Sequence, residues 1–404
     1  MVRCLLFILF LAGCVSTPPH KLQDGDYLFV WASDASARAS DFLAVIDVNP
    51  RSPTYADIVA SAPVGVAGTR AHHTEHIMPR GGILLANGFQ AGRTFLFDLR
   101  DPLKPFVSGS FANAGDYMHA HSFARLPNGH VLATFQMRGH GNAAPGGLVE
   151  LSTEGRVLRA SSAADPDVEG SIRPYSLAVV PALDRVVTTS SDMHEADVSR
   201  VVQVWRLSDL SLIKSFKLPP GPRGRENEEP AEPRLLSDGR TVAVSSFNCG
   251  LFLIDGLEGR RPGAELVHSF PGAADKMKCG LPVVSGRYWI QSDASVPGLV
   301  SLDLSDPRHP VETGRLTLPG GHEPHWISLA PDGERIVISG GIGAGRMRVL
   351  IARIDRSTGK LSLDPSFRAR DGSEPGISFD RAEWPHGATG PAVPHGAVFS
   401  REGR

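Results

Sequence analysis

Short apolar runs of four to eight residues alternate with turn-forming residues along most of the chain. Examples are "DYLFVWA", "FLAVIDV", "RTFLFDL", "HVLATFQ", "VVQVWRL" and "RIVISGG", separated by clusters of Gly, Pro, Asp and Ser. From residue 26 onward, no long segment has the 3.6-residue period of an amphipathic helix. The pattern therefore predicts an all-β body.

A longer repeat is superimposed on this alternation. Seven segments share the form of a strand followed by a turn, as in "HSFARLPNG" and "HWISLAPDG", and they start at residues 73, 121, 175, 231, 279, 325 and 395. Most intervals between starts are 46 to 56 residues, and the last is 70. Repeats of this length with about four strands each are typical of a β-propeller. The sequence thus predicts a seven-bladed β-propeller over residues 26–404.

The two ends of the chain are expected to share one blade. The last start, "HGAVFSREG", leaves no room for three further strands, while "DYLFVWA", "FLAVIDV" and "ADIVASA" precede the first complete blade. Pairing of the terminal strands would close the ring and remove exposed sheet edges. Two β-sandwich domains are the alternative, but they give no reason for seven equivalent starts. The segment "GPRGRENEEPAEP" (221–233) is interpreted as a charged loop between blades.

The N-terminus resembles an export signal. A short apolar run follows one early positive charge, and Leu11-Ala12-Gly13-Cys14 is similar to a bacterial lipobox. We expect a signal peptide at residues 1–13 and a tether at residues 14–25, with the protein anchored to a bacterial membrane in the periplasm through lipidated Cys14. An ordinary cleaved signal and an uncleaved anchor are the alternatives.

The rest of the composition excludes a polyanion partner. The formal net charge is −2 and no run of Lys or Arg is present, so nucleic acid is not an expected partner. Apart from residues 1–14, the chain has two cysteines, Cys249 and Cys279. They could pair in an oxidising compartment, or each could be a buried small side chain.

The first residues of the seven repeats form a column rich in histidine. In a propeller the first strand of each blade lines the central channel, so these positions are expected to face one another. The column consists of His73, His121, Tyr175, Ala231, Cys279, His325 and His395. Its four histidines come from consecutive blades, and converging neutral imidazoles are good ligands for Zn, Cu, Fe or Ni. A metal site at His73, His121, His325 and His395 is therefore the hypothesis, and a polar, water-filled channel mouth is the alternative.

Residues near the column carry weaker signals. Tyr175 and Cys279 are candidates for redox chemistry or proton transfer, although both could simply line the channel. The flanking histidines would become ligands or supporting groups if the register differed by one or two residues; they are His72, His76, His119, His322 and His386. Alternation along a strand predicts that His72 points away from His73.

Several motifs resemble the selenium-binding protein and methanethiol oxidase family. They include "DFLAVIDVNPRSPTY" followed by His72-His73, "HSFARLPNGHVLATF", "EPRLLSDG" and "LVSLDLSDPRHPVETGRL", and they are spread over nearly the whole chain after the signal. The resemblance implies a seven-bladed propeller. It also implies a copper enzyme that converts methanethiol, oxygen and water to formaldehyde, hydrogen sulfide and hydrogen peroxide, with His73 and His121 matching family histidines.

The chain also departs from the family pattern. The family motif His-His-x-Gly-Trp-Asn is here His72-His73-Thr74-Glu75-His76-Ile77, and Ala56 replaces the cysteine associated with selenium. His325 stands where the family usually has glutamine, and the C-terminal ending differs. These departures leave the thiol substrate and selenium binding open while adding histidines to the column.

Three functions are consistent with these observations. The first is a copper-dependent oxidoreductase, with zinc or iron as alternative metals, acting on a small reduced-sulfur compound with oxygen. The second is a non-catalytic metal-binding or metal-delivery lipoprotein that uses the same site. The third is a propeller scaffold that binds protein partners on its faces.

Overall fold

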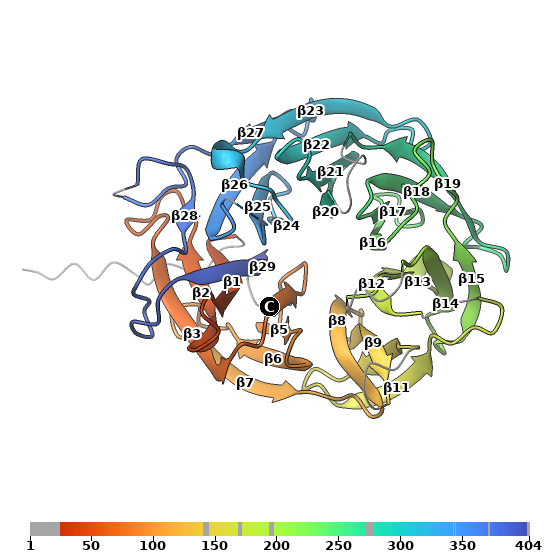
Figure 1. The fold of residues 1–404 in the computed structure, drawn as a ribbon, viewed down its shortest axis with the longest axis horizontal. Helices are drawn as coiled ribbons and strands as arrows, with labels where there is room; N and C mark the ends of the chain where they lie inside the picture. The colour runs from red at the N-terminus through yellow and green to blue at the C-terminus, as the bar shows by residue number, and fades with distance from the viewer. Residues whose placement is uncertain are drawn as a thin grey trace, which may run out of the picture.

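Seven small antiparallel sheets form a ring in the computed structural model of the chain (Figure 1). The structure describes residues 25–139, 145–168, 172–193, 198–271, 278–341, 343, 345–370 and 372–401. The expected signal peptide and nearly all of the tether, including Cys14, lie outside the described residues. Within the described ranges the regular structure is all β, apart from two 3-10 turns at Pro181–Leu183 and Pro319–Gly321. No helix in this part of the chain is long and apolar enough to cross a membrane.

The ring is closed by the two ends of the chain, as the repeat predicted. Blade 1 pairs the C-terminal strand with three N-terminal strands. Its strands, from the inside outward, are β29 (Ala392–Phe399), β1 (Tyr27–Asp34), β2 (Ser40–Asp47) and β3 (Ile58–Ala67). β1 pairs with both β29 and β2, so neither of its own edges is left unpaired.

The other six blades follow one another along the chain, each with its first strand innermost. Blade 2 contains β4 (Ala71–Thr74), β5 (Ile83–Gly88), β6 (Arg93–Asp98) and β7 (Phe106–Phe111). Blade 3 contains β8 (Tyr117–Arg125), β9 (Val131–Arg138), β10 (Gly147–Leu151) and β11 (Val157–Ser162). Blade 4 contains β12 (Pro174–Val180), β13 (Arg185–Ser190), β14 (Val201–Arg206) and β15 (Leu212–Lys217).

Blades 5 to 7 complete the ring. Blade 5 contains β16 (Pro230–Leu235), β17 (Val242–Ser246), β18 (Gly250–Asp255) and β19 (Gly263–Ser269). Blade 6 contains β20 (Cys279–Ser285), β21 (Tyr288–Asp293), β22 (Gly298–Asp303) and β23 (Val311–Thr317). Blade 7 contains β24 (Trp326–Leu329), β25 (Arg335–Ser339), β26 (Arg348–Ile354) and β27 (Leu361–Leu363), with β28 (Ile377–Ser378) also paired to β26.

The hydrophobic core is divided among the interfaces between blades. One cluster joins Trp31 of blade 1 to Phe95 of blade 2, and another joins Leu253 of blade 5 to Trp289 of blade 6. Each blade is a twisted sheet with two apolar faces, so it buries both only by packing against two neighbours. The ring therefore holds the seven inner strands at fixed positions around a central space, which we call the hub.

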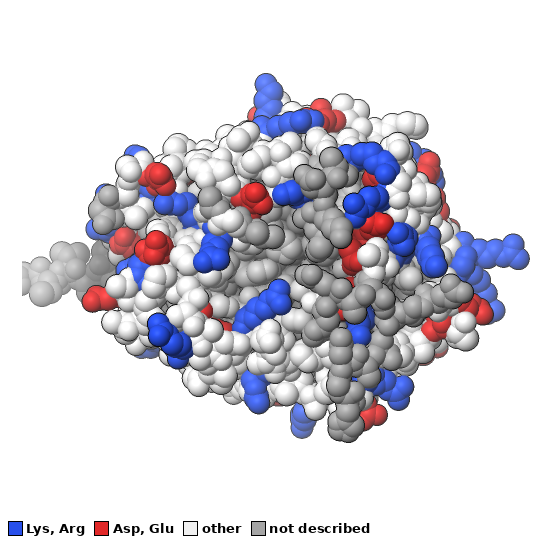
Figure 2. Space-filling view, viewed as in Figure 1, with Lys and Arg blue, Asp and Glu red and all other residues white. Residues whose placement is uncertain are grey.

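The interpretation of residues 221–233 as a charged loop between blades was partly wrong. The structure places Pro230–Leu235 in β16, the innermost strand of blade 5, so the end of this acidic run lies in the hub and is not a surface loop. On the outer surface, Lys and Arg side chains are interspersed with Asp and Glu over the face in Figure 2.

Candidate metal centre

A β-bulge at the same place in the inner strands brings two consecutive residues to the hub. In blade 3, Ala120 and Phe123 pair with residues only two apart on β9, so His121 and Ser122 form the bulge. The same one-residue shift occurs in blades 1, 2, 4, 5 and 6. A bulge bends a strand and redirects its side chains. Each inner strand thus offers a first and a second hub position.

The two hub positions can be assigned around the ring. The first positions are His72, His121, Tyr175, Ala231, Gly280, His325 and His395. The second positions are His73, Ser122, Ser176, Glu232, Leu281, Trp326 and Gly396. Five members of the predicted column are therefore correct in register. The other two, His73 and Cys279, are shifted by one residue from their equivalents, His72 and Gly280.

Polar side chains of the second strands hold the first hub positions. In four blades a buried hydroxyl donates to the carbonyl of the first position in the next blade: Thr134 Oγ1 to Tyr175 (2.8 Å), Thr189 Oγ1 to Ala231 (2.6 Å), Ser292 Oγ to His325 (3.2 Å) and Ser339 Oγ to His395 (2.6 Å). In blade 2, Asn87 Nδ2 does the same for His121 at 3.1 Å. Each of these bonds gives the carbonyl a partner from the preceding blade. They also fix the backbone that carries the imidazoles.

The prediction that His72 points away from His73 is wrong. The two rings are stacked, with centroids 4.4 Å apart and an interplanar angle of 13°. Both residues lie in the bulge between Ala71 and Thr74, where the alternation of an ideal strand does not apply. His72 therefore joins the candidate site as a residue that the column had left out.

Three histidines come together closely enough to share an ion. One ring nitrogen from each of His72, His73 and His121 lies within 4.8 Å of the other two. The rings of His73 and His121 are 4.3 Å apart, and those of His72 and His121 are 5.0 Å apart. All three side chains are buried, with exposures of 4%, 0% and 0%. Rigid neighbouring blades thus gather imidazoles from two inner strands at one point.

The hydrogen bonds of His121 leave one nitrogen free to bind a metal. Its Nδ1–H donates to the carbonyl of Tyr175 at 2.8 Å, which assigns the proton to Nδ1. Its Nε2 is buried without a hydrogen-bond partner, as is Nδ1 of His72. A metal-binding histidine normally donates its other nitrogen to a carbonyl or carboxylate in this way. The donor set fits a transition metal that accepts imidazole.

Burial keeps these imidazoles neutral. It lowers the pKa of His72, His73 and His395 well below the usual value, and nearby imidazoles lower it further. Burial also lowers the pKa of His121 to about 3, against a smaller opposing effect from the charge of Glu232. Neutral imidazole is the form that binds a metal, so the site is ready for one at neutral pH.

The two remaining histidines of the predicted quartet lie beside the cluster. His395 stacks on His72 with ring centroids 4.3 Å apart, and its buried Nδ1 also lacks a hydrogen-bond partner. His325 lies on the far side of His395, at 5.2 Å between rings. The structure thus brings His73 and His121 together with His72, puts His395 next to them, and leaves His325 at the edge of the cluster.

Tyr175 lies against the cluster. Its ring is 4.0 Å from that of His121, and its hydroxyl is 3.4 Å from Nε2 of His73. Burial and the negative charge of Glu232 raise its pKa well above the usual value, so the phenol keeps its proton. The oxygen of this neutral phenol can therefore accept a hydrogen bond from Nε2–H of His73, which leaves the lone pair of Nδ1 for a metal.

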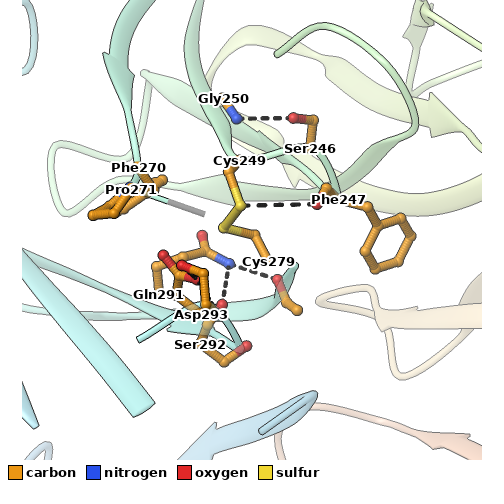
Figure 3. Close-up of a disulfide and its surroundings, with 12 residues drawn as sticks. Ser246, Phe247, Cys249, Gly250, Phe270, Pro271, Cys279, Gln291, Ser292 and Asp293 are labelled. Atoms are coloured by element: carbon orange, nitrogen blue, oxygen red, sulfur yellow. Dashed lines mark hydrogen bonds between the residues drawn. A yellow bond between two sulfur atoms is a disulfide. The ribbon is translucent and has the colours of Figure 1, made fainter. Parts of the chain in front are cut away.

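Cys279 is joined to Cys249 in a disulfide that links blades 5 and 6 (Figure 3). The two residues are 30 apart in the chain, and their Cα atoms are 5.1 Å apart. The buried carboxylate of Asp293 lies beside the two sulfurs. Of the two possibilities left open by the sequence, pairing is the one in the structure. A paired Cys279 has no thiolate to offer, so a chemical role would require its reduction first.

Three other residues near the column in sequence have partners away from the cluster or offer no ligand. Nδ1 of His386 lies 2.7 Å from the hydroxyl of Ser61 on β3, the outermost strand of blade 1. Glu75, which follows the histidine pair closely in the sequence, pairs with Arg125 at 2.7 Å. Ala56 is buried at the turn before β3, where it offers no sulfur or selenium ligand.

Sequence reasoning missed two residues of the hub. Glu232 was hidden in an acidic run, although it directly follows Ala231 of the column. Trp326 follows His325 in the same way, and its ring lies 4.9 Å from that of His73. Looking one residue beyond each column member would have found both.

The fold and this cluster define the class of protein: a seven-bladed β-propeller with a histidine-rich hub. No protein-family model matches the chain. Over 336 residues, 77% of the chain and 74% of the relative, it is 24% identical to a methanethiol oxidase from a Hyphomicrobium species. This similarity agrees with the resemblance of the motifs to the selenium-binding protein and methanethiol oxidase family.

Solved structures are similar over the whole ring. A hypothetical selenium-binding protein from Sulfolobus tokodaii has a TM-score of 0.72 and 18% identity, with 94% of each chain covered. A putative 6-phosphogluconolactonase from Bacteroides fragilis has a TM-score of 0.61 and 12% identity, covering 93% of this chain and 97% of that one. At such identities these structures show a common fold.

Proposed function

We propose that the protein is a copper-dependent oxidoreductase that oxidises a small thiol at the hub. The observation that carries the proposal is the buried, unpartnered Nε2 of His121, set beside His72 and His73 while Nδ1 is held by the carbonyl of Tyr175. The relation to a methanethiol oxidase supports the thiol as substrate. Zinc and iron are alternative metals for the same ligands.

The residues would have distinct roles. His72, His73 and His121 would hold the metal, and His395 could complete the set. Copper would supply the exchange of electrons between the thiol and oxygen. Tyr175 would orient His73, because its hydroxyl oxygen can accept a hydrogen bond from Nε2–H and leave the lone pair of Nδ1 for the metal. Phe247, whose ring is 5.4 Å from Tyr175 and 5.8 Å from His325, would limit the access of water.

The proposed location is the periplasm, with the protein attached to a membrane through lipidated Cys14. The lipobox-like residues before Cys14 support this proposal. Labelling of cells with a radioactive fatty acid tests it, because label should enter the wild-type protein and not the Cys14→Ser variant.

The test of function combines metal analysis with oxygen-dependent consumption of methanethiol. The wild-type protein should retain copper at this centre and consume thiol together with oxygen. His121→Asn should bind copper more than about 100-fold more weakly, since loss of a ligand should exceed the 10- to 100-fold effect of losing an outer hydrogen bond. His309→Asn, which removes an exposed histidine, should behave like the wild type.

The outcomes separate the functions that the sequence left open. Copper bound at His121 without thiol oxidation would favour a metal-binding or metal-delivery protein. Copper binding that is equal in the wild type and His121→Asn would contradict the proposed centre and favour a scaffold with a wet, polar hub.

A further inference from the structure

A second group of metal-binding side chains lies next to the first. Ligand atoms of His73, His76 and Glu232 all lie within 4.8 Å of one another. His73 belongs to both groups, whereas His76 and Glu232 take no part in the proposed copper centre. The two groups therefore meet at a single imidazole, and His73 would serve two ions only by losing its ring proton and binding one ion through each nitrogen.

His76 reaches this position because the inner strand of blade 2 is short. β4 has only 4 residues and ends at Thr74, whereas β8 in the next blade has 9 residues. After Thr74 the chain brings the ring of His76 onto Trp326 of blade 7, with centroids 4.7 Å apart and an interplanar angle of 7°. Near-parallel stacking fixes the plane of the imidazole. Burial lowers the pKa of His76, and the charge of Arg234 adds to this effect, so the ring is neutral and able to bind a metal.

Glu232 is a buried carboxylate with one free oxygen. Its Oε2 accepts hydrogen bonds from Ser176 (2.6 Å) and Arg234 (2.5 Å), and it lies 3.6 Å from Nε2 of His76. Its Oε1 has no hydrogen-bond partner, although the residue has 0% exposure. A buried acceptor without a partner carries a desolvation penalty, which a bound cation would remove.

Although burial alone would raise the pKa of Glu232, Arg234, His76 and Ser176 lower it to about 2. The carboxylate is therefore ionised. Outer hydrogen bonds of this kind hold carboxylate ligands in place at metal sites. The same guanidinium also repels a cation, because Arg234 Nη2 lies 3.3 Å from Nε2 of His76. An ion here should accordingly bind more weakly than one at the first group.

We propose that His73, His76 and Glu232 form a second position for a divalent transition metal in the hub. Two imidazoles and one carboxylate that leave other coordination positions open are a common donor set for such ions. The proposal rests on the proposed function only through the shared His73. His76 stands where the motif of the related family has tryptophan, so the second position would distinguish this chain from relatives that keep that motif.

The test is the number of copper ions bound by protein first stripped with a chelator. The protein is titrated with Cu²⁺, freed of weakly held ions by desalting, and analysed for metal. The wild type should retain two ions. Glu232→Gln, which keeps the size of the side chain, and His76→Phe, which keeps an aromatic ring on Trp326, should each retain one. The exposed-site control His309→Phe should retain two, and circular dichroism should confirm that each variant is folded.

The results distinguish this proposal from the proposed function. One ion in the wild type and also in both hub variants would overturn the second position and leave the first standing. One ion in the wild type that is lost in Glu232→Gln but kept in His121→Asn would support the second position and overturn the first. No tightly held ion in the wild type would overturn both.

Discussion

At the residue scale, the hub is a set of imidazoles that the fold keeps neutral and close together. Blades 1, 2, 3 and 7 bring His72, His73, His121, His325 and His395 to one region without a paired carboxylate for each. Isolated from water, such groups would cost free energy if they were charged. Keeping these imidazoles neutral leaves lone pairs that can bind a metal, and it lowers the free energy of unfolding at acid pH.

The metal-free protein should lose stability as the pH falls. Burial lowers the pKa of His121 to about 3 and that of His325 to about 4, whereas histidine in an unfolded chain titrates near pH ~6.5. Between these values the unfolded chain binds protons that the folded protein does not. The free energy of unfolding should therefore fall by up to about 1.4 kcal/mol per pH unit for each such histidine.

Urea unfolding of the metal-free protein at several pH values between 7.5 and 4.5 measures this effect. The slope should be smaller for His325→Gln, which removes one of the titrating groups. A free energy of unfolding that does not change over this range would contradict the neutral, buried state of the histidines.

At the scale of the element, the bulge decides what an inner strand presents to the hub. It puts two consecutive residues there, and a hydroxyl or amide from the preceding blade fixes the first of them. The hub is therefore built by backbone geometry that repeats around the ring, and blades differ mainly in the residues at these two positions.

Thr134 and Thr189 provide a matched pair of variants at equivalent places. Thr134 Oγ1 donates to the Tyr175 carbonyl that also receives the His121 proton, whereas Thr189 Oγ1 donates to the carbonyl of Ala231. Replacing either by valine should lower the free energy of unfolding by about 1–3 kcal/mol, because a buried carbonyl loses a partner. Only Thr134→Val should also weaken copper binding at the first group, by about 10-fold.

Chemical unfolding and copper titration of both variants provide the measurement. Equal copper affinity in the two variants, with equal losses of stability, would show that the hydrogen bond to Tyr175 does not orient His121.

The sequence predicted the strands and the blades well, but not the register of every hub residue. The spacing to the turn glycine works for His121 and His325, where the glycine N–H closes the turn eight residues later, at Gly129 and Gly333. In blade 2 the N–H that closes the turn belongs to Gly82, which follows the short β4. The sequence pattern was counted from Gly81, and eight residues before Gly81 is His73, not His72. Spacing fails here because His72 lies ten residues before the turn glycine, whereas His121 and His325 each lie eight residues before theirs.

At the scale of the whole molecule, ring closure and the disulfide hold the blades around the hub. β29 pairs with β1 to join the two ends of the chain, and the Cys249–Cys279 bond connects blades 5 and 6. The hub depends on ring closure, because residues from blades 1, 2, 3 and 7 meet there.

The disulfide should stabilise the ring without taking part in the chemistry. In the chain-entropy account, a cross-link across about 30 residues contributes about 3–4 kcal/mol. The double variant Cys249→Ala/Cys279→Ala should therefore unfold at a lower urea concentration while keeping its copper content and thiol consumption. Loss of thiol consumption with copper retained and the fold intact would instead support a chemical role for Cys279.

The most direct measurement of the central claim is a crystal structure of the copper-loaded protein with anomalous diffraction recorded at the copper edge. The account predicts a strong anomalous peak in the hub, within about 2.0–2.1 Å of Nε2 of His121 and within bonding distance of nitrogens of His72 and His73, the range typical of metal–imidazole bonds. A loaded protein whose anomalous peaks all lie away from these three imidazoles would contradict it.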